Sequence, residues 1–586
     1  MTNDERTNMR VLVERVMNGF SGVKIDEDIY SSLRSQVDSF PFIVSHAGIC
    51  KLECKKQKED DLFWLCPVSS YIAITKKLVY IDGLRVDIMI EYFDGNTVKE
   101  RRVDREMTLS KIGVKSLLKY GISFNESRCD SFLLYLLQSD NRAPIEYVHS
   151  HLGWMEIDGS KIFRSYKSLS RKGAWPSTSL YAGDLDIKPH GSAEAWLKMA
   201  RNDVLPYTPL TFCMLCGFAA PVLSRLYDKY DLGSLIISIS GDSSRGKTTA
   251  AMLAASEFSS PISRFGLVQS FNATQNYLIT FLSEHSGLPI VFDEGGTYSN
   301  DFNALFYMIS SGTDKGRLTK DAVMKVPLQW NSIVLTTAEF VPFKDDSPNG
   351  IHARCFCLTD AMTRSADHSD RIKTVISENY GKVGNQFVQW LLNTPDVDFE
   401  ADYLCCKKIL HKRLVDSGIK SGRFTSRVFS RLAVIVQVAD YVSQCFDLNI
   451  NMESLLHYII RIERNVNAQT DSVQKALDDI LGEVSSTSAR YISETKLNPD
   501  NVLGKIEQDG DFKLISILRP EFNRICKKYS LQPKLMLKEF KQRQILDCEK
   551  DRLSRRVRLQ RGLPEQVCYI LKIKDPQDTK SVSMEF

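Results

Sequence analysis

The sequence predicts an α/β protein whose central part is a parallel sheet with crossover helices. Residues 234–360 alternate between short apolar stretches, typical of buried strands, and longer stretches of helix-forming residues. This alternation is characteristic of strand–helix–strand units, which build parallel sheets. Before this region the chain has short alternating segments with "DG" turns, and after it the composition is helical. We therefore expect an α+β domain first, the parallel sheet second and helical parts third.

The composition is that of a folded protein with several domains. The chain has 586 residues, of which 43% are hydrophobic and 25% are charged, so it can form several packed cores. Its net charge of +4 is small, so any affinity for nucleic acid must come from local basic patches. The first residues lack the order of a signal peptide, and no apolar run approaches the roughly 20 residues that span a bilayer. We expect a soluble, cytoplasmic protein without a membrane partner.

Changes in composition predict five segments. They are an N-terminal α+β domain (1–190), a nucleotide-binding core (191–378), a helical lid (379–483), a polar linker (484–512) and a C-terminal winged-helix domain (513–586). The winged helix is predicted from two helix-like stretches that begin near Pro520 and Pro533, because proline suits the first helical turn. A basic stretch and the strand-like "QVCYILKI" follow them, as in a wing.

The stretch "SLIISISGDSSRGKTTAAMLAAS" (234–256) contains the spacing of a phosphate-binding loop. In such a loop, glycines allow tight turns, backbone N–H groups surround the phosphates, the lysine reaches the terminal phosphates and the hydroxyl binds Mg²⁺. The apolar residues before the loop suit a buried strand, and the residues after it form helices well. The predicted nucleotide-binding residues are Gly241, Asp242, Ser243, Ser244, Arg245, Gly246, Lys247, Thr248 and Thr249.

An acidic pair follows the next strand-like stretch, "PIVF". Asp293 is predicted to hold Mg²⁺ together with Thr248, and Glu294 to orient and deprotonate the attacking water. Phosphoryl transfer to water needs a positioned nucleophile as well as charge neutralisation. The loop and the pair together favour a nucleotide hydrolase over a protein that only binds nucleotide.

Two further positions complete the predicted catalytic set. The stretch "NSIVLTTAEF" ends in Thr336 and Thr337, and we prefer Thr336 as the polar side chain that contacts the γ-phosphate or the water. Arg354 precedes a short apolar strand and is predicted to reach the γ-phosphate of a neighbouring subunit as an arginine finger. An ordinary surface arginine is the alternative for Arg354.

The motifs, in their order, resemble the domain of unknown function 927 family. They are "GDSSRGKTTAAMLAAS", "FNATQNYL", "LPIVFDEGG", "FYMISSGTDKGRLTKD", "WNSIVLTTAE" and "GIHAR". That family includes the Cch-type, MCM-like AAA+ helicases of staphylococcal cassette chromosome elements. The resemblance implies an AAA+ P-loop core with a helical lid, ATP and Mg²⁺ as cofactors, and a homo-oligomeric ring, expected to be a hexamer. It further implies movement along single-stranded or forked DNA during replication of a mobile element or phage.

The resemblance also suggests residue roles. It matches Lys247, Asp293, Glu294, Thr336 and Arg354 to the catalytic set, and Arg427 to the second sensor. Arg423 and Arg431 lie four residues to either side of Arg427, on the same helical face, and remain alternatives. The chain departs from the family pattern at Ile279, where an acidic residue is expected. The alternative function is a nucleotide-switched regulatory or defence ATPase that acts on protein partners.

Two basic segments are predicted to contact DNA. The first lies between Gly312 and Trp330, where MCM-like motors place a hairpin in the channel of the ring, and solvated loop charges are its alternative. The second is a dense arginine patch on the predicted wing. The predicted contacts are Lys315, Arg317, Lys320 and Lys325 in the first segment and Arg552, Arg555, Arg556, Arg558 and Arg561 in the second.

The 14 cysteines show no disulfide framework. Cys213 and Cys216 lie in an apolar, helix-like stretch, and we expect them to be buried small hydrophobes. A zinc site at Cys50, Cys54 and Cys66 would need one more ligand, and their spacing is not a standard one.

Overall fold

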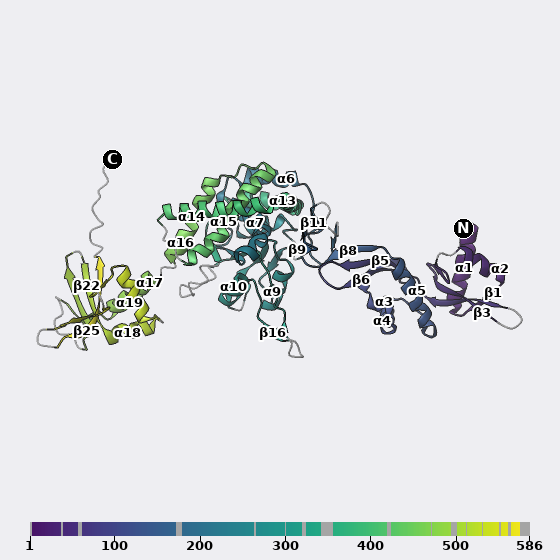
Figure 1. Ribbon diagram of the computed structural model, residues 1–586, viewed down its shortest axis with the longest axis horizontal. Coiled ribbons are helices and arrows are strands. Elements are labelled where there is room, and N and C mark those ends of the chain that lie inside the picture. Colours follow the sequence, from purple (N-terminus) through teal and green to yellow (C-terminus); the bar gives the residue numbers. More distant parts are fainter. Residues whose placement is uncertain are drawn as a thin grey trace. The chain divides into compact units, whose positions relative to one another are not determined.

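In the computed structural model (Figure 1) the chain forms two compact units, one within 1–344 and 353–460 and the other containing 461–586. The described residues are 3–574 without 37–38, 57–60, 172–177, 263–264, 299–300, 319–323, 341–354, 419–422, 470–471, 494–500, 511, 530, 550–551 and 561–563. Within described helices, the side chains of some residues, among them 423–428, are also left undescribed.

The N-terminal part of the first unit contains two sheets. The first has the order β1-β4-β3-β2 and carries helices α1 (Asn3–Gly19) and α2 (Glu27–Gln36). Its strands are β1 (Val23–Ile25), β2 (Phe42–Ser45), β3 (Gly48–Lys55) and β4 (Leu62–Ser69). The second has the order β12-β8-β5-β6-β7. Its strands are β5 (Ile72–Tyr80), β6 (Val86–Phe93), β7 (Val98–Asp104), β8 (Ile145–His149) and β12 (Leu180–Tyr181).

Helices between β7 and β8 cover the second sheet. They are α3 (Glu106–Leu109), α4 (Lys111–Ser116) and α5 (Cys129–Arg142). Alternate residues of the strands, such as Ile72 and Ile74 on β5, point into a core that also contains Phe132 and Leu136 of α5. This alternation is the period-2 pattern of a sheet with one buried face.

A three-stranded sheet, β9 (Gly153–Ile157), β10 (Ser160–Arg164) and β11 (Leu169–Ser170), leads toward the central sheet. Gly153 has φ +89°, and a Cβ atom there would lie 1.6 Å from the carbonyl oxygen of Ser286, so only glycine fits. The indole N–H of Trp154 donates to the carbonyl of Pro221 at 2.8 Å. These contacts join β9 to the segments that contain Ser286 and Pro221.

The predicted parallel sheet is confirmed. Five strands lie in the order β14-β15-β18-β13-β19, and every neighbouring pair is parallel. They are β13 (Leu235–Ser240), β14 (Val268–Ser270), β15 (Ile290–Asp293), β18 (Ile333–Ala338) and β19 (Cys355–Leu358). β13 has a partner on each side and is wholly buried, which explains its run of isoleucines. Because the strands are parallel, their carboxyl ends all lie at one edge of the sheet.

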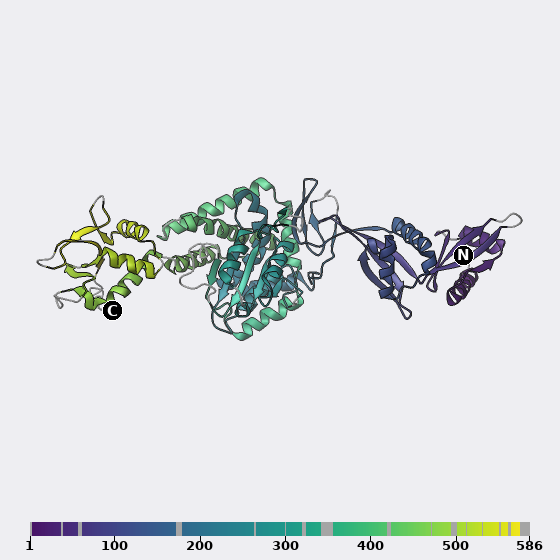
Figure 2. The ribbon, with the colours of Figure 1, turned by 90° about the horizontal axis from the view of Figure 1, so that it is seen from below.

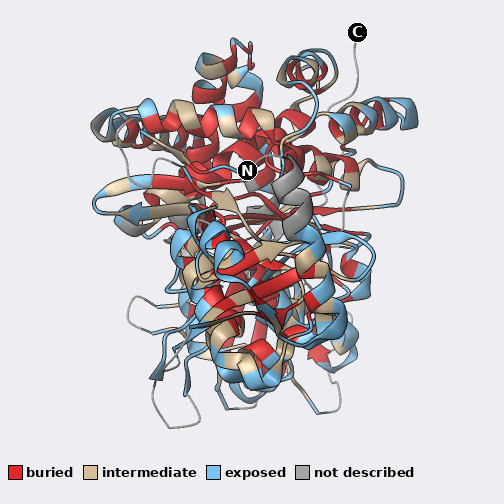
Figure 3. Ribbon diagram, turned by 90° about the vertical axis from the view of Figure 1, so that its right-hand side faces the viewer, coloured by how far each residue is buried: buried red, intermediate tan, exposed pale blue. Residues whose placement is uncertain are grey.

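Helices surround this sheet (Figure 2). Those that pack on it are α7 (Thr208–Tyr230), α8 (Lys247–Ser256), α9 (Gln275–Glu284) and α10 (Phe302–Ser311), and α12 (Ala366–Glu378) packs on α8. Further helices follow as α13 (Lys382–Asn393), α14 (Asp396–Asp416), α15 (Arg423–Phe446) and α16 (Met452–Gln469). Figure 3 colours the chain by burial, and the central strands β13 and β18 are buried at every residue.

Helix α7 is a long apolar helix of this layer. Cys213 and Cys216 are fully buried on it, as the sequence predicts. Contrary to the prediction that no apolar run approaches this length, its segment Thr208–Tyr227 is, among the described residues, long and apolar enough to cross a membrane. However, 83% of its most apolar stretch is buried inside the fold. A core helix of this kind packs against protein on all sides.

The second unit has its own core. Helix α17 (Ser472–Ser486) precedes strands β20 (Tyr491–Ile492), β21 (Gly504–Asp509) and β22 (Phe512–Leu518). Helices α18 (Arg519–Lys528) and α19 (Pro533–Gln542) follow, with Pro520 and Pro533 in their first turns as predicted. The unit ends in β23 (Leu546–Asp547), β24 (Arg555–Val557) and β25 (Gln566–Lys574), of which β25 pairs with β22, β23 and β24.

Candidate nucleotide site and nucleic-acid interfaces

The glycine-rich loop joins the carboxyl end of β13 to the first residue of α8, Lys247. Gly241 has φ +139° and Gly246 has φ +75°, conformations that favour glycine. A Cβ atom on Gly246 would lie 2.4 Å from the side-chain oxygen of Thr363. The two glycines are therefore required by the backbone turn and by close packing, and the loop directs the amino end of α8 toward the edge of the sheet.

The lysine lies inside its own loop. Its ammonium donates to the carbonyl oxygens of Gly241 at 2.8 Å and Asp242 at 2.7 Å. Phosphate oxygens are stronger acceptors for an ammonium than neutral carbonyls are. The lysine is thus placed where an anion at the loop would meet it.

Three segments bring polar groups together beside the loop. The Thr248 hydroxyl donates to Oδ1 of Asp293 at 3.3 Å. The Thr337 hydroxyl, at the end of β18, donates to the same oxygen and accepts the backbone N–H of Glu294 at 3.2 Å. Glu294 itself has φ +62°, an uncommon conformation for a residue with a side chain. Thr337 therefore contacts the Asp293 carboxylate and the backbone of Glu294.

Thr336 does not take part in this arrangement. It pairs in register with Phe292 of β15 and Ser238 of β13, and its hydroxyl is buried with no hydrogen-bond partner among the described residues. Successive side chains of a strand point to opposite faces of the sheet. The structure thus brings Thr337, and not the preferred Thr336, to the acidic pair.

A segment after β19 packs along the loop, which the sequence did not predict. The backbone N–H of Met362 donates to the carbonyl of Arg245 at 2.7 Å, and the Arg245 guanidinium donates to the carbonyl of Thr359 at 3.4 Å. Helix α12 adds a hydrogen bond of 2.6 Å between Thr249 and Ser369. No sequence motif marks these contacts, because they join residues more than a hundred positions apart.

Of the arginines predicted as the finger or the second sensor, the structure describes the side chain of only Arg431. Arg354 lies outside the described residues, and the side chains of Arg423 and Arg427, at the start of α15, are likewise not described. Arg431 is buried, and its Nε donates to the carbonyl of Leu232, just before β13. Because the glycine-rich loop follows the other end of β13, Arg431 stabilises the start of this strand and does not lie beside the loop.

The side chains at the loop fit a magnesium nucleotide. Mg²⁺ takes oxygen ligands, usually one or two from protein with the rest from phosphates and water. The Thr248 hydroxyl and the Asp293 carboxylate are such ligands, and they already lie 3.3 Å apart. The described residues contain no group of three or more metal-ligating side chains, at this place or around Cys50, Cys54 and Cys66.

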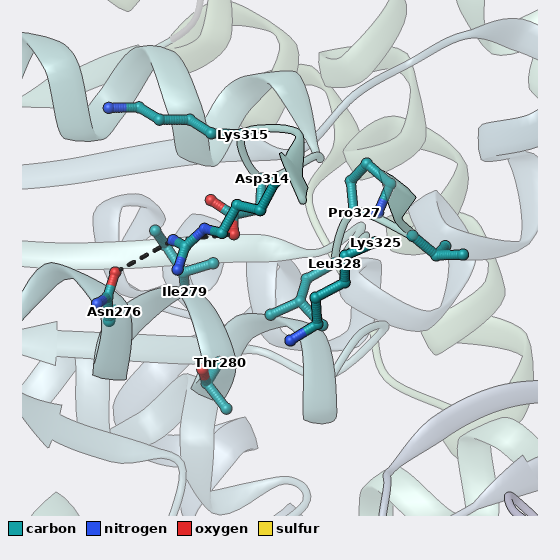
Figure 4. A pocket seen from close by; sticks show the side chains of 10 residues that line it. Asn276, Ile279, Thr280, Asp314, Lys315, Lys325, Pro327 and Leu328 are labelled. Atoms are coloured by element: carbon teal, nitrogen blue, oxygen red, sulfur yellow. Dashed lines mark hydrogen bonds and ion pairs between the residues drawn. The ribbon is translucent and has the colours of Figure 1, made fainter. Parts of the chain in front are cut away.

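The first basic segment forms a hairpin beside helix α9. Strand β16 (Arg317–Leu318) pairs with β17 (Met324–Lys325), so that Arg317 lies opposite Lys325. Lys315, Arg317 and Lys325 line one pocket together (Figure 4). Lys320 lies outside the described residues. Three of the four predicted cations thus come together.

The second basic segment flanks β24 in the second unit. Arg555 pairs with Asp547 at 3.0 Å and is therefore bound within the domain. Arg552, Arg556 and Arg558 are exposed, and Arg561 lies outside the described residues. Lys534 and Lys538, four residues apart on α19, are also exposed. Their spacing puts them on one face of the helix, and the sequence analysis did not include them among the predicted DNA contacts.

The fold defines an α/β protein with a central parallel sheet and a separate helix–helix–strand domain near its C-terminal end. Residues 42–327 match the family described as Domain of unknown function (DUF927), and residues 471–577 match the Cch helix turn helix domain. The predicted resemblance is therefore confirmed: the chain contains a DUF927 domain followed by a Cch helix turn helix domain. No curated protein shows significant sequence similarity to it.

Comparison with solved structures gives matches of very different quality, of which two are described. One, named "SCCmec type IV Cch - active helicase", is 23% identical, with a TM-score of 0.72 over 92% of this chain and 98% of that one. At this identity the likeness establishes a shared fold. The other is the apo structure of the NrS-1 C-terminal region, 11% identical over 86% of this chain and 96% of that one. Its TM-score of 0.30 is too low to support an argument.

Proposed function

We propose that the protein is an AAA+ ATPase that uses ATP hydrolysis to move along DNA and separate its strands. The observation that carries this proposal is the convergence of Lys247, Thr248 and the acidic pair at one edge of the parallel sheet. The solved protein with the same fold is named an active helicase, which supports the same function here. The helix-turn-helix match and the basic hairpin supply surfaces for DNA.

We assign each residue of the site a role that its contacts or its place in the sequence motifs support. Magnesium ATP bound at the loop would supply the phosphoryl group and the charge that neutralises its oxygens. Lys247 is placed to bind the terminal phosphates, and Thr248 and Asp293 to hold the metal. Glu294 orients and deprotonates the attacking water, while Thr337 fixes its backbone. The second sensor would come from Arg427 and the finger from Arg354.

Strand separation on a forked DNA duplex tests this proposal. The wild-type protein should separate the strands with ATP and Mg²⁺. Lys247→Ala should lose nucleotide affinity, whereas Glu294→Gln should keep ATP bound and hydrolyse it at a small fraction of the normal rate. Normal turnover by Glu294→Gln would show that the acidic pair has been assigned wrongly.

We further propose a ring in which Arg354 completes the site of the next subunit. Lys247→Ala and Arg354→Ala proteins should each be inactive alone. In mixed rings about a quarter of random interfaces combine an intact loop with an intact arginine, so hydrolysis should reappear on mixing. Mixed rings that stay inactive, with mixing verified by two different tags, would argue against a finger at Arg354 in independently firing sites.

A further inference from the structure

Besides the acidic pair, the edge of the sheet that carries the glycine-rich loop has a further carboxylate, that of Glu339. This residue directly follows β18, whose last residue, Ala338, pairs in register with Ser240 at the end of β13. The backbone N–H of Gly241 also donates to the Ala338 carbonyl at 3.3 Å. Since β18 lies between β15 and β13, the chain leaves the sheet at Glu339 between the acidic pair and the glycine-rich loop.

The Glu339 carboxylate contacts the loop directly. The hydroxyl of Ser243 donates to its Oε1 atom. The next loop residue, Ser244, has φ +65°, an uncommon conformation for a residue with a side chain. The Lys247 ammonium adds its hydrogen bonds to two backbone carbonyls of the loop. An anion at the loop competes with the contacts of both charged groups, because it attracts the ammonium and repels the carboxylate.

The loop and Glu339 together contribute two cations and two carboxylates. Arg245 pairs with Asp242 at 3.2 Å, which leaves Lys247 and Glu339 as the second pair of opposite charges. Bound phosphates therefore gain the attraction of Lys247 and are opposed by the charge of Glu339. Because Ser243 and Glu339 are both exposed, dissolved salt should weaken this opposition.

We propose that Glu339 is a positioning residue of the nucleotide site, which holds the empty loop through Ser243 and weakens the binding of phosphates by its negative charge. The inference rests on the proposed hydrolysis of ATP and adds a control on how tightly the nucleotide is held. A nucleotide that is bound too tightly leaves slowly, and product release limits the rate of many enzymes. A carboxylate beside the loop therefore favours the exchange of ADP for a new ATP.

Equilibrium binding of fluorescent nucleotides to the full-length protein in the presence of Mg²⁺ tests the proposal. The probes are mant-labelled ADP and a mant-labelled ATP analogue that is not hydrolysed. Glu339→Gln should tighten binding about three- to tenfold at about 0.1 M salt, where charges act over about 10 Å. The gain should be larger for the ATP analogue, which carries more negative charge. It should nearly vanish at about 1 M salt, where screening reduces this range to about 3 Å.

A second variant tests the contact itself. Ser243→Ala removes the hydroxyl that keeps the carboxylate at the loop, so in this background Glu339→Gln should have a much smaller effect on affinity. Glu378→Gln is the matched control, because it removes the same charge from an exposed position at the end of α12 and should leave affinity unchanged. Both Ser243 and Glu339 are exposed, so neither substitution removes buried packing, and the thermal unfolding midpoint reports whether each variant is folded.

Weaker or unchanged nucleotide binding by Glu339→Gln would overturn this role of Glu339. So would an equal effect of Glu378→Gln, a gain that is the same at both salt concentrations, or full additivity of Ser243→Ala and Glu339→Gln. If the wild type binds both nucleotides and Lys247→Ala does not, such a result contradicts only this inference. A wild type that binds neither nucleotide contradicts the proposed function as well.

Discussion

Thr336 and Thr337 are neighbours on β18, yet their hydroxyl groups have different surroundings. Thr337 contacts Asp293 and the backbone of Glu294, whereas the Thr336 hydroxyl has no partner among the described residues. A hydrogen bond to a charged group contributes about 1.5–3 kcal/mol, and its loss at a site affects the reaction directly. The place of each hydroxyl in the sheet therefore brings Thr337, and not Thr336, into contact with the acidic pair.

Thr337→Ala should lower the rate of ATP hydrolysis about tenfold or more, because the acidic pair loses the group that fixes it. Thr337→Ser should restore most of the rate, since it keeps the hydroxyl. Thr336→Ala is the matched control and should leave the rate close to that of the wild type. A larger effect at Thr336 than at Thr337 in steady-state hydrolysis would contradict this assignment.

At the scale of elements, the sequence was most informative where strands, helices and turns depend on neighbouring residues. The isoleucine run of β13, the glycine-bounded loop and the first turns of α18 and α19 were all predictable for this reason. Which threonine of β18 lies beside Asp293 depends on the pairing of β18 with β15, two segments distant in the sequence. The sequence alone therefore did not identify Thr337 as the residue that contacts the acidic pair. Likewise, the burial of Arg431 beside Leu232 follows from the packing of α15, which no local pattern reveals.

Two buried histidines make the fold sensitive to acid, and one of them, His149, joins separate segments. His149, at the end of β8, contacts the Ser179 hydroxyl at 2.8 Å and the Ser165 carbonyl at 2.6 Å. His285, after α9, contacts the carbonyl of Phe281 at 2.7 Å. Burial lowers the pKa of each imidazole to about 4, from an ordinary value of 6.5. Both side chains are therefore neutral in the folded protein at neutral pH.

The unfolded chain binds protons at these histidines below pH 6.5, and the folded chain does so only near pH 4. Stability should therefore be fully present above pH 6.5 and fall as the pH drops toward 4. His149→Gln removes one titrating group and should flatten this fall in the thermal unfolding midpoint. An unchanged pH profile would mean that His149 does not contribute to the acid sensitivity.

At the scale of the whole molecule, the helix-turn-helix unit has a core of its own. Val473 and Ile480 of α17 share this core with Phe522 of α18 and Leu571 of β25. A cut within this unit would expose apolar residues that are now buried. The domain limits predicted from composition stay a prediction, but any truncation that tests the unit must remove α17 with it.

Removal of residues 471–586 should leave ATP hydrolysis intact and reduce binding to duplex DNA, because the predicted catalytic residues all precede Ser472 and the exposed arginines follow it. Gel-shift assays with duplex DNA, beside measurements of hydrolysis, check both parts. A charge-reversed Arg556→Glu protein of full length is the control for non-specific effects of truncation. Loss of hydrolysis on truncation would show that the second unit supports the ATPase site.

The most direct test of the account is the rate of ATP hydrolysis with and without single-stranded DNA. If the protein moves along DNA, the strand must be coupled to the site formed by Lys247, Asp293 and Glu294, and single-stranded DNA should raise the rate severalfold. Arg317→Ala should lose most of this stimulation and keep the DNA-independent rate. A wild-type rate that is the same with and without DNA would contradict the account and favour a regulatory ATPase that acts on protein partners.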